Sequence, residues 1–318
     1  MKGIFVLLLI SGFVFGGQRT VLVEVFASTT CQYCTDAVRG VEELKNYHGD
    51  TVSILVYYPG ATDPFRVTES YQRATYYSIS GVPVAIFDGV KRVEGGSPDR
   101  TSMYPVYRDT FDIRKIVDQP VVFEVTGNYD PDSRHGDLQV TILNLSGDTL
   151  SGYLRTAEVL MDTNYQWQDM DHLFYVVRKM FPDAKGIFVK ILPYDVASLN
   201  IEFAVGGLDT EEKVAFVLFL QNDETKEVLG SRPEVRLTSL RWSSVSEVSR
   251  NGIKVISGRK SVKFLLGNSS VVSDLSIFDV HGREIFEKRS VTGEISVNLK
   301  PGIYFYRSAG IKGKFVVY

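Results

Sequence analysis

The sequence predicts an α/β domain followed by two all-β sandwich domains. Strand and helix signals alternate through residues 17–118, and short apolar strands separated by polar turns follow from residue 119. The length of 318 residues exceeds one ordinary domain and suits two or three domains of about 100 to 150 residues each. With 44% hydrophobic and 23% charged residues, the composition excludes disordered, collagen-like and coiled-coil proteins.

Residues 1–16 are typical of a secretory signal peptide. Met1 and Lys2 give a positive start, and residues 3–15 form an apolar run. As a helix this run would reach only about 20 Å, whereas a membrane core measures about 30 Å, so a permanent span fits less well. We expect cleavage after Gly16; a buried first strand and an uncleaved anchor are the alternatives. Export would take both cysteines to a compartment where disulfides persist.

Residues 17–118 contain the signals of a small α/β domain. The predicted elements, in order, are the strand TVLVEVF, a helix from about Cys31 to Tyr47, the strand TVSILVYY, a helix near residues 65–78, the strands VAIFDG and VKRVEGG, and a helix between Asp99 and Val117. The last two strands are expected to form a hairpin, because Asp88 and Gly89 supply the positive φ that a two-residue turn requires.

Residues 119–236 are predicted to form an antiparallel, immunoglobulin-like sandwich. The apolar segments separated by polar turns are PVVFEVTGNY, DLQVTILNLS, TLSGYLRTAEVLM, LNIEFAVGG and KVAFVLFLQ. The segment DHLFYVVRKMFPDAKG, residues 171–186, is less regular, and its backbone is left unassigned.

A serine-rich linker, residues 237–249, is predicted to lead into a last sandwich of the same kind, residues 250–318. Residues 241–318 carry 13 Lys and Arg against 6 Asp and Glu, a net charge of +7, whereas the rest carries 22 against 32, a net charge of −10. This change of sign supports a domain boundary. The basic end is either a solvated sandwich face or a charge-guided docking surface. The net charge of the whole chain, −3, argues against nucleic acid as a partner.

The motif CQYC, residues 31–34, lies between a predicted strand and a predicted helix. The helical stripe that faces the core contains Cys34, Val38, Val41 and Leu44. The Cys34 sulfur is therefore expected to be buried, and the Cys31 sulfur to be exposed at the helix tip. Unpaired N–H groups and the macrodipole at a helix N-terminus stabilise a thiolate, which lowers a cysteine pKa from about 8.5. Cys31 is thus the predicted nucleophile, and Cys34 is placed to resolve the mixed disulfide.

No metal site or cofactor is predicted. Two cysteines are too few for a disulfide-stapled scaffold or a four-thiolate zinc site. The four histidines fall in different segments without ligand spacing, at His48, His135, His172 and His281.

The strand VLVEVF, the motif CQYC on a helix and the tripeptide GVP before a hairpin resemble the thioredoxin family over about 100 residues. The resemblance implies a cis peptide bond between Val82 and Pro83, which would bring the Val82 backbone against the dithiol. A cis X–Pro bond costs only about 0.5–1 kcal/mol. The resemblance also implies that Pro83 shapes a client groove and that Gln32, Tyr33 and Val82 contact the substrate.

The same resemblance draws attention to Glu24 in the strand before the cysteines. Thioredoxin-like enzymes often bury an acid there that shuttles the proton of the second thiol, and apolar neighbours would raise its pKa by desolvation. This sequence has one more residue between acid and cysteine than the usual pattern, so a surface charge at the strand end is the alternative. The pair Gln32-Tyr33 departs from the family's common Gly-Pro, Gly-His and Pro-His forms, so the direction of electron flow is not carried over.

The segments LSIFDVHGREIFEKRS and EISVNLKPGIYFYRSAGIKGKFVVY resemble the C-terminal sorting domain, type A, of the type IX secretion pathway. A Gly-Arg turn at residues 282–283, a Pro-Gly turn at 301–302 and alternation in IYFYR and KFVVY carry this resemblance. It implies that the type IX secretion machinery of the outer membrane is a partner. A generic bacterial surface sandwich is the alternative.

The segments VVRKMFPDAKG and FVLFLQNDETKEVLGS resemble the middle domain of Bacteroidetes-type outer-membrane surface proteins with a thioredoxin-like front. The whole arrangement implies an exported protein at the outer membrane, at the cell surface or outside the cell.

The first functional hypothesis is a thiol-disulfide oxidoreductase that acts on protein thiols and disulfides through Cys31 and Cys34. The alternative is a surface binding or structural protein in which the disulfide is redox-inert. A half metal site is a third interpretation of the cysteine pair. Peroxidase activity lacks support, because no acidic or arginine partner of Cys31 is identifiable from the sequence.

Overall fold

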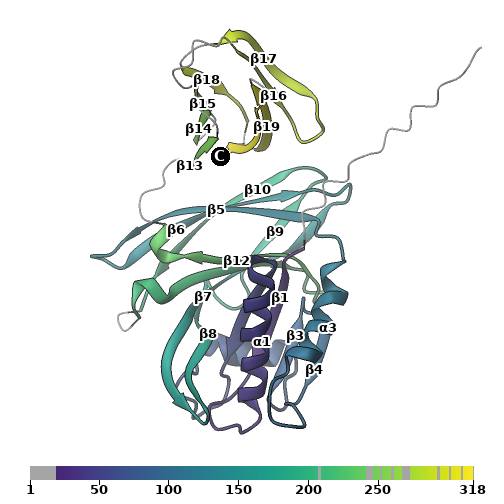
Figure 1. The fold of residues 1–318 in the computed structure, drawn as a ribbon, viewed down its shortest axis with the longest axis vertical. Coiled ribbons are helices and arrows are strands. Elements are labelled where there is room, and N and C mark those ends of the chain that lie inside the picture. The colour runs from purple at the N-terminus through teal and green to yellow at the C-terminus, as the bar shows by residue number, and fades with distance from the viewer. Residues whose placement is uncertain are drawn as a thin grey trace, which may run out of the picture.

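The computed structural model describes residues 19–206, 209–240, 246–250, 253–258, 261–266, 273–291, 294–300, 302–308 and 311–317. The predicted signal peptide, residues 1–16, lies outside the described residues. Within the described part, no helix combines the length and apolar character needed to cross a membrane. We refer below to an N-terminal α/β unit (residues 19–118), a middle β unit (119–240) and a C-terminal β unit (246–317), shown in Figure 1.

The N-terminal α/β unit has the predicted order of elements, namely β1 (Val21–Phe26), α1 (Cys34–His48), η1 (Gly49–Thr51), β2 (Val52–Tyr57), α2 (Thr68–Tyr76), β3 (Val84–Phe87), β4 (Lys91–Glu94) and α3 (Tyr104–Lys115). Strand β1 is central, parallel to β2 and antiparallel to β3. Its six residues are all buried, because helices and neighbouring strands cover both faces. The turn between β3 and β4 has three residues, 88–90, rather than the predicted two, and Asp88 and Gly89 have positive φ as expected.

The middle β unit continues the sheet of the α/β unit instead of forming a separate one. Its strands are β5 (Val121–Asp130), β6 (His135–Asn144), β7 (Leu150–Trp167), β8 (Met170–Phe181), β9 (Ile187–Ile191), β10 (Val196–Ala204), β11 (Val214–Gln221) and β12 (Val228–Arg236), with η2 (Glu211–Lys213) and η3 (Leu237–Ser239). The nine-stranded sheet runs β12-β11-β7-β8-β2-β1-β3-β4, and β9 pairs with β7. The predicted boundary at residue 118 therefore divides one continuous sheet.

Strand β2 contacts the middle β unit through β8 and β12, among other strands. Strand β8 lies parallel to β2 with Val56 opposite Val176, and the hydroxyls of Ser53 in β2 and Ser231 in β12 lie 3.0 Å apart. The unassigned segment 171–186 supplies most of β8 and the turn into β9. Alternation within a segment indicates a strand but does not identify its partner, so the shared sheet was not predicted.

The middle β unit is rich in strands, as predicted, and these strands form two packed layers. Strands β10, β6 and β5 make a three-stranded sheet that packs on the large one. Aromatic rings fill the space between the sheets, with the Phe203 and Phe216 centroids 4.5 Å apart and Phe181 6.2 Å from both. One hydrophobic core thus extends from the α/β unit through the sandwich.

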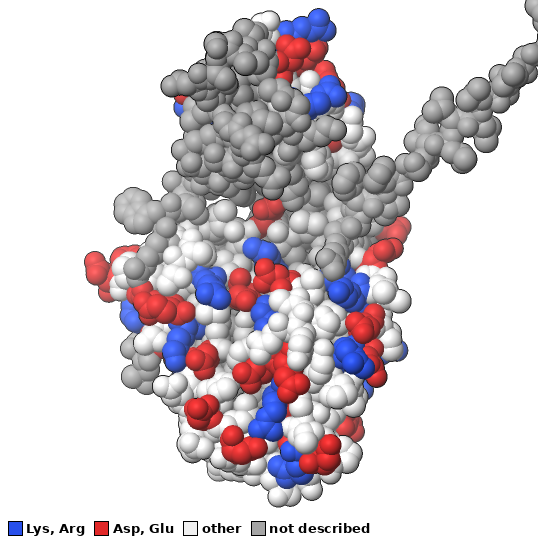
Figure 2. Space-filling view, viewed as in Figure 1, with Lys and Arg blue, Asp and Glu red and all other residues white. Residues whose placement is uncertain are grey.

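The C-terminal β unit has two four-stranded antiparallel sheets, β13-β14-β15-β18 and β17-β16-β19-β20. The strands are β13 (Ser246–Arg250), β14 (Ile253–Gly258), β15 (Ser261–Leu266), β16 (Ser273–Phe278), β17 (Glu284–Val291), β18 (Glu294–Asn298), β19 (Gly302–Ser308) and β20 (Ile311–Val317). The unit has its own core, which includes Phe264, Tyr306 and Phe315. Strand β13 begins inside the predicted linker, so the linker is shorter than expected. Figure 2 shows charges of both signs interspersed on the visible face of the α/β and middle units.

Candidate functional site

Cys31 and Cys34 form a disulfide bond between the C-terminal end of β1 and the start of α1. Cys34 is fully buried, whereas Cys31 is half-buried at the edge of the core. This asymmetry is the one expected from the helical stripe. The helix begins at Cys34 rather than at Cys31, so Cys31 lies in the turn before it, and the Cys34 N–H donates to the Cys31 carbonyl over 3.4 Å.

The N-terminus of α1 carries no side-chain cap. Tyr33 occupies the N-cap position, and its side chain makes no capping hydrogen bond. The first N–H groups of a helix have no partner within the helix, so a nearby anion is stabilised by them and by the macrodipole. The positive end of the helix macrodipole therefore favours a thiolate on nearby Cys31 once the disulfide is reduced.

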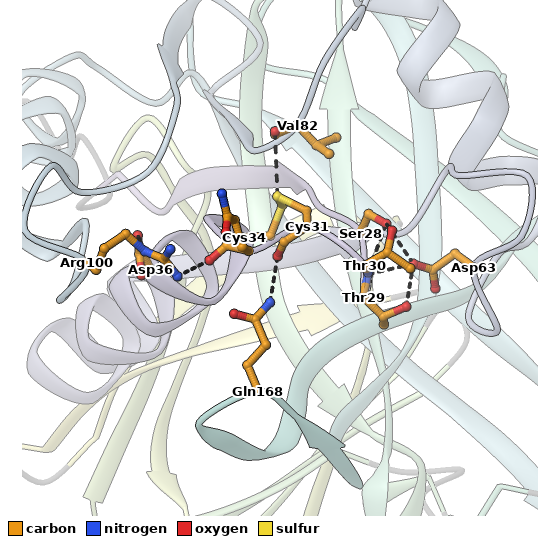
Figure 3. Close-up of a disulfide and its surroundings, with 11 residues drawn as sticks. Ser28, Thr29, Thr30, Cys31, Cys34, Asp36, Asp63, Val82, Arg100 and Gln168 are labelled. Atoms are coloured by element: carbon orange, nitrogen blue, oxygen red, sulfur yellow. Dashed lines mark hydrogen bonds and ion pairs between the residues drawn. A yellow bond between two sulfur atoms is a disulfide. The ribbon is translucent and has the colours of Figure 1, made fainter.

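The peptide bond between Val82 and Pro83 is cis, as expected, and Pro83 is buried just before β3. The Val82 carbonyl oxygen lies 3.7 Å from the Cys31 Sγ (Figure 3). The predicted juxtaposition of the Val82 backbone and the first cysteine is thus present in the structure.

The loop that leads into Cys31 is held by Asp63, a buried residue after β2. Its Oδ2 accepts hydrogen bonds from the Thr29 N–H at 2.7 Å, the Thr29 hydroxyl at 2.9 Å and the Ser28 hydroxyl at 3.3 Å (Figure 3). A carboxylate with three donors fixes the path of the chain between β1 and the disulfide.

The two residues between the cysteines face solvent and are braced by Arg100. Gln32 and Tyr33 are exposed, which suits their predicted role in substrate contact. The Arg100 guanidinium lies 4.6 Å from the Tyr33 ring centroid, donates to the Gln32 carbonyl and pairs with the buried Asp36 at 3.2 Å. Arg100 thus places a positive charge beside the motif.

A residue of the middle β unit also reaches the motif. Gln168, in the turn between β7 and β8, donates from its Nε2 to the Cys31 carbonyl oxygen over 2.8 Å. In Figure 3, Gln168 and Val82 approach Cys31 from opposite sides. The environment of Cys31 is therefore built by both units.

Glu24 is completely buried, so the surface-charge interpretation is wrong. Its carboxylate accepts hydrogen bonds from Arg73 Nη2 at 2.8 and 2.9 Å, from the Tyr77 hydroxyl at 2.6 Å and from the Tyr57 hydroxyl at 3.1 Å. Arg73 lies in α2, and Tyr77 directly follows the helix. Because side chains alternate between the two faces of a strand, Glu24 lies on the face of β1 that points toward α2. Among the described residues, no hydrogen bond joins Glu24 to either cysteine. The structure thus gives Glu24 an ion-pair partner in place of the proposed thiol.

Burial and the Glu24 charge shift the pKa values of the groups around it. Burial raises the pKa of both Tyr57 and Tyr77 well above the ordinary value, and repulsion from Glu24 raises it further. Burial lowers the pKa of Arg73, but attraction to Glu24 outweighs it and the pKa ends above the usual range. The tyrosines therefore stay protonated as donors, and Arg73 stays charged.

Sequence reasoning missed Asp63, Arg100 and Gln168. They bond to groups 34, 68 and 137 residues away along the chain, so no local spacing relates them to the motif. The dipeptide Asp63-Pro64 after a strand marks a turn, which is the one local signal. No group of three metal-ligating side chains is found within the described ranges.

No protein-family model matches the chain. It is 29% identical over 87 residues to a probable thioredoxin of Methanothermobacter thermautotrophicus, across 27% of this chain and 92% of that protein. A probable thioredoxin of Methanothermobacter marburgensis is also 29% identical, over 89 residues that cover 28% of this chain and 94% of that protein. The N-terminal α/β unit is thioredoxin-like.

Among solved structures, the chain is similar to HBP35 of Porphyromonas gingivalis, with a TM-score of 0.56 and 14% sequence identity. The likeness covers 94% of this chain and 98% of that one. At this identity it shows the fold alone, a thioredoxin-like region followed by a body of β-strands. The predicted thioredoxin-like fold is confirmed, whereas the sorting domain stays a prediction.

Proposed function

We propose that this protein is an exported thiol-disulfide oxidoreductase that acts on protein thiols and disulfides through Cys31 and Cys34. The observation that carries the proposal is the half-buried Cys31 sulfur, in contact with the Val82 carbonyl, above a fully buried Cys34. A client sulfur can approach only the outer of the two atoms, so attack is directed to Cys31.

The exchange needs no cofactor. In the oxidised protein, a client thiolate attacks the Cys31 sulfur, the Cys31–Cys34 bond breaks, and Cys34 leaves as a thiolate that takes up a proton. A second client thiolate then attacks the client sulfur of the mixed disulfide and releases Cys31 as a thiolate. The client gains a disulfide and the protein gains two electrons. The reverse sequence reduces a client disulfide, with Cys34 as the resolving thiolate.

The reduction potential of the couple decides the physiological direction. A value near −270 mV belongs to a reductant and one near −120 mV to an oxidant, whereas a disulfide below about −300 mV is a structural staple. Equilibration of the protein with glutathione or dithiothreitol buffers measures it directly.

Mixed-disulfide trapping tests the activity itself. In Cys34→Ser the resolving thiol is missing, so incubation with insulin is expected to give a covalent complex that reductant releases. The matched control is Cys31→Ser, which retains only the buried sulfur and should trap no client. Equal trapping by both variants, or none by either, would contradict the proposal.

Export and surface location form part of the same proposal. Support comes from the apolar run of residues 3–15 and from the resemblance of the C-terminal β unit to a type IX sorting domain. We infer that both β units are immunoglobulin-like sandwiches and that the outer-membrane type IX secretion machinery recognises residues 250–318. Removal of these residues is expected to keep the protein in the periplasm, which cell fractionation with an antibody to the α/β unit measures.

The second candidate function is a surface binding or structural protein with an inert thioredoxin-like scaffold. The complete burial of Cys34 and the existing disulfide favour it, because both also suit a permanent staple. Under this alternative, Cys31→Ser leaves association with the cell surface and any ligand intact, and the couple has a potential below about −300 mV.

A further inference from the structure

The β7–β8 hairpin of the middle β unit lies against the first turns of α1. Gln168 of the hairpin donates a hydrogen bond to the Cys31 carbonyl. Two ion pairs also join the hairpin to α1, Asp169 with Arg39 at 2.9 Å and His172 with Glu42 at 3.2 Å. The hairpin thus contacts the helix along its side as well as at the disulfide.

Aromatic packing and an amide brace fix the end of this hairpin. Trp167 is buried with its ring 6.0 Å from that of Tyr58, at the end of β2. Gln166 donates from its Nε2 to the carbonyls of Gln168 at 3.0 Å and Met170 at 3.2 Å. These contacts hold the backbone of the turn in place, and so they fix the point from which the Gln168 side chain extends.

Gln168 has a backbone conformation that its residue type rarely adopts. Its φ is 56°, and it is the first of the two residues between the paired Trp167 and Met170. Glycine or asparagine is the usual choice at such a turn position, because other side chains are disfavoured there by about 1 kcal/mol. A glutamine in this disfavoured conformation suggests that its side chain has a function. The hydrogen bond to the Cys31 carbonyl is a candidate for that function.

The hydrogen bond from Gln168 acts on the backbone of Cys31, the half-buried cysteine. It fixes the carbonyl that also accepts from the Cys34 N–H, so the two cysteines are held in one mutual arrangement. Prior ordering of two reacting groups lowers the entropy cost of joining them and raises their effective concentration. Disulfide closure is favoured as a result.

We propose that Gln168 is a positioning residue of the redox site, through which the middle β unit biases the Cys31/Cys34 couple toward the disulfide. The inference rests on the proposed function only in assuming that the couple opens and closes. It implies that the redox site extends beyond the thioredoxin-like unit.

The test compares Gln168→Gly and Gln168→Ala with the wild type in glutathione redox buffers. We expect this hydrogen bond to be made in the disulfide form and lost in the dithiol form, because only such a difference shifts the equilibrium. One hydrogen bond contributes about 1 kcal/mol, so the equilibrium constant for disulfide formation is expected to fall roughly two- to tenfold in both variants. This corresponds to a rise in reduction potential of about 10 to 30 mV. Gln72→Ala, which replaces an exposed glutamine on α2, is the matched control and should leave the constant unchanged.

Gln168→Gly separates positioning from a merely structural role. Glycine relieves the positive φ, so the melting temperature of this variant is expected to equal or exceed that of the wild type while its potential still rises. A wild-type equilibrium constant in Gln168→Gly would overturn the inference. The redox equilibrium is measured without any client, so failure of insulin trapping, which bears on the proposed function, is a separate result.

Discussion

Strand β1 carries two clusters of opposite character. At its C-terminal end lies the disulfide, with a half-buried sulfur, an uncapped helix N-terminus and two exposed residues between the cysteines. On one face of the same strand, Glu24 is sealed from solvent and both its carboxylate oxygens are engaged. The Cys31 sulfur is thus partly accessible to solvent, whereas the Glu24 carboxylate is satisfied internally.

The two clusters differ in role: the disulfide end is the proposed redox site, whereas the Glu24 cluster supports the fold. A buried charge must be paired and hydrogen-bonded, so the Glu24 cluster is an obligatory structural unit once the chain has placed a carboxylate there. The disulfide end instead keeps Cys31 within partial reach of solvent, as the proposed exchange with a client requires. Three changes, ordered by expected effect, test this distinction.

Glu24→Gln should have the largest effect on stability. It leaves the Arg73 guanidinium buried without its counter-charge, and loss of one partner of a buried ion pair costs about 3 to 5 kcal/mol of unfolding free energy. Urea unfolding followed by circular dichroism measures the change. Glu94→Gln, which removes an exposed partner of Arg92, is the control and should cost less than about 1 kcal/mol.

Glu24→Gln also tests whether Glu24 takes part in thiol exchange. If Glu24 is purely structural, folded Glu24→Gln resolves a preformed mixed disulfide through Cys34 at a rate within about twofold of the wild type. A resolution rate that is greatly reduced and no longer depends on pH would restore the proton-shuttle role that the sequence resemblance implied.

Glu158 in β7 should give the next largest effect, through pH. It is 2% exposed, and among the described residues its Oε2 has no hydrogen-bond partner. Burial first, and repulsion from Asp209 second, raise its pKa from 4.5 to about 7, against the attraction of Lys179, Arg178 and Arg134. The folded protein therefore binds this proton more tightly than the unfolded chain. The resulting stabilisation is complete below about pH 4.5 and is lost as the pH rises to about 7.

Wild-type stability should accordingly fall by up to about 3 kcal/mol between pH 5 and pH 8 relative to Glu158→Gln, which mimics the protonated form. Urea unfolding of both proteins across this range gives the difference. Parallel pH profiles would show that this buried acid, like Glu24, has a satisfied charge.

Arg100→Ala should have the smallest effect and act only at the disulfide end. Loss of the cation leaves the Asp36 carboxylate uncompensated in the first turn of α1, which raises the pKa of the reduced Cys31 thiol. Alkylation of the reduced protein by iodoacetamide at pH 7 is expected to slow roughly two- to fivefold. Arg92→Ala is the control; equal slowing in both variants would assign the effect to general charge.

The features that the sequence predicted correctly are mostly those that a short segment of chain determines by itself. The order of elements in the α/β unit and the burial of Cys34 follow from periodicity within one unit, whereas the cis peptide before Pro83 was implied by the resemblance to the thioredoxin family. Strand segments in the middle β unit were also recognisable, because alternation survives whatever the strand pairs with.

Contacts between distant segments were not predictable in this way. The pairing of β2 with β8 and the bond from Gln168 to Cys31 depend on how two units dock, and nothing near either residue specifies the partner. Glu24 shows the same limit, since the sequence left burial and a surface position both open and gave no sign of its partner Arg73, 49 residues further on.

The shared sheet has a practical consequence for fragments of this protein. A polypeptide cut after residue 118 would expose β2, whose six residues are all buried in the intact protein, as a bare edge. This edge would lack the contacts of Val56 with Val176 and of Ser53 with Ser231. Exposed edges of this kind recruit other chains, so such a fragment is expected to aggregate where the intact protein does not. Recombinant work on the redox motif is better served by a polypeptide that extends to residue 240.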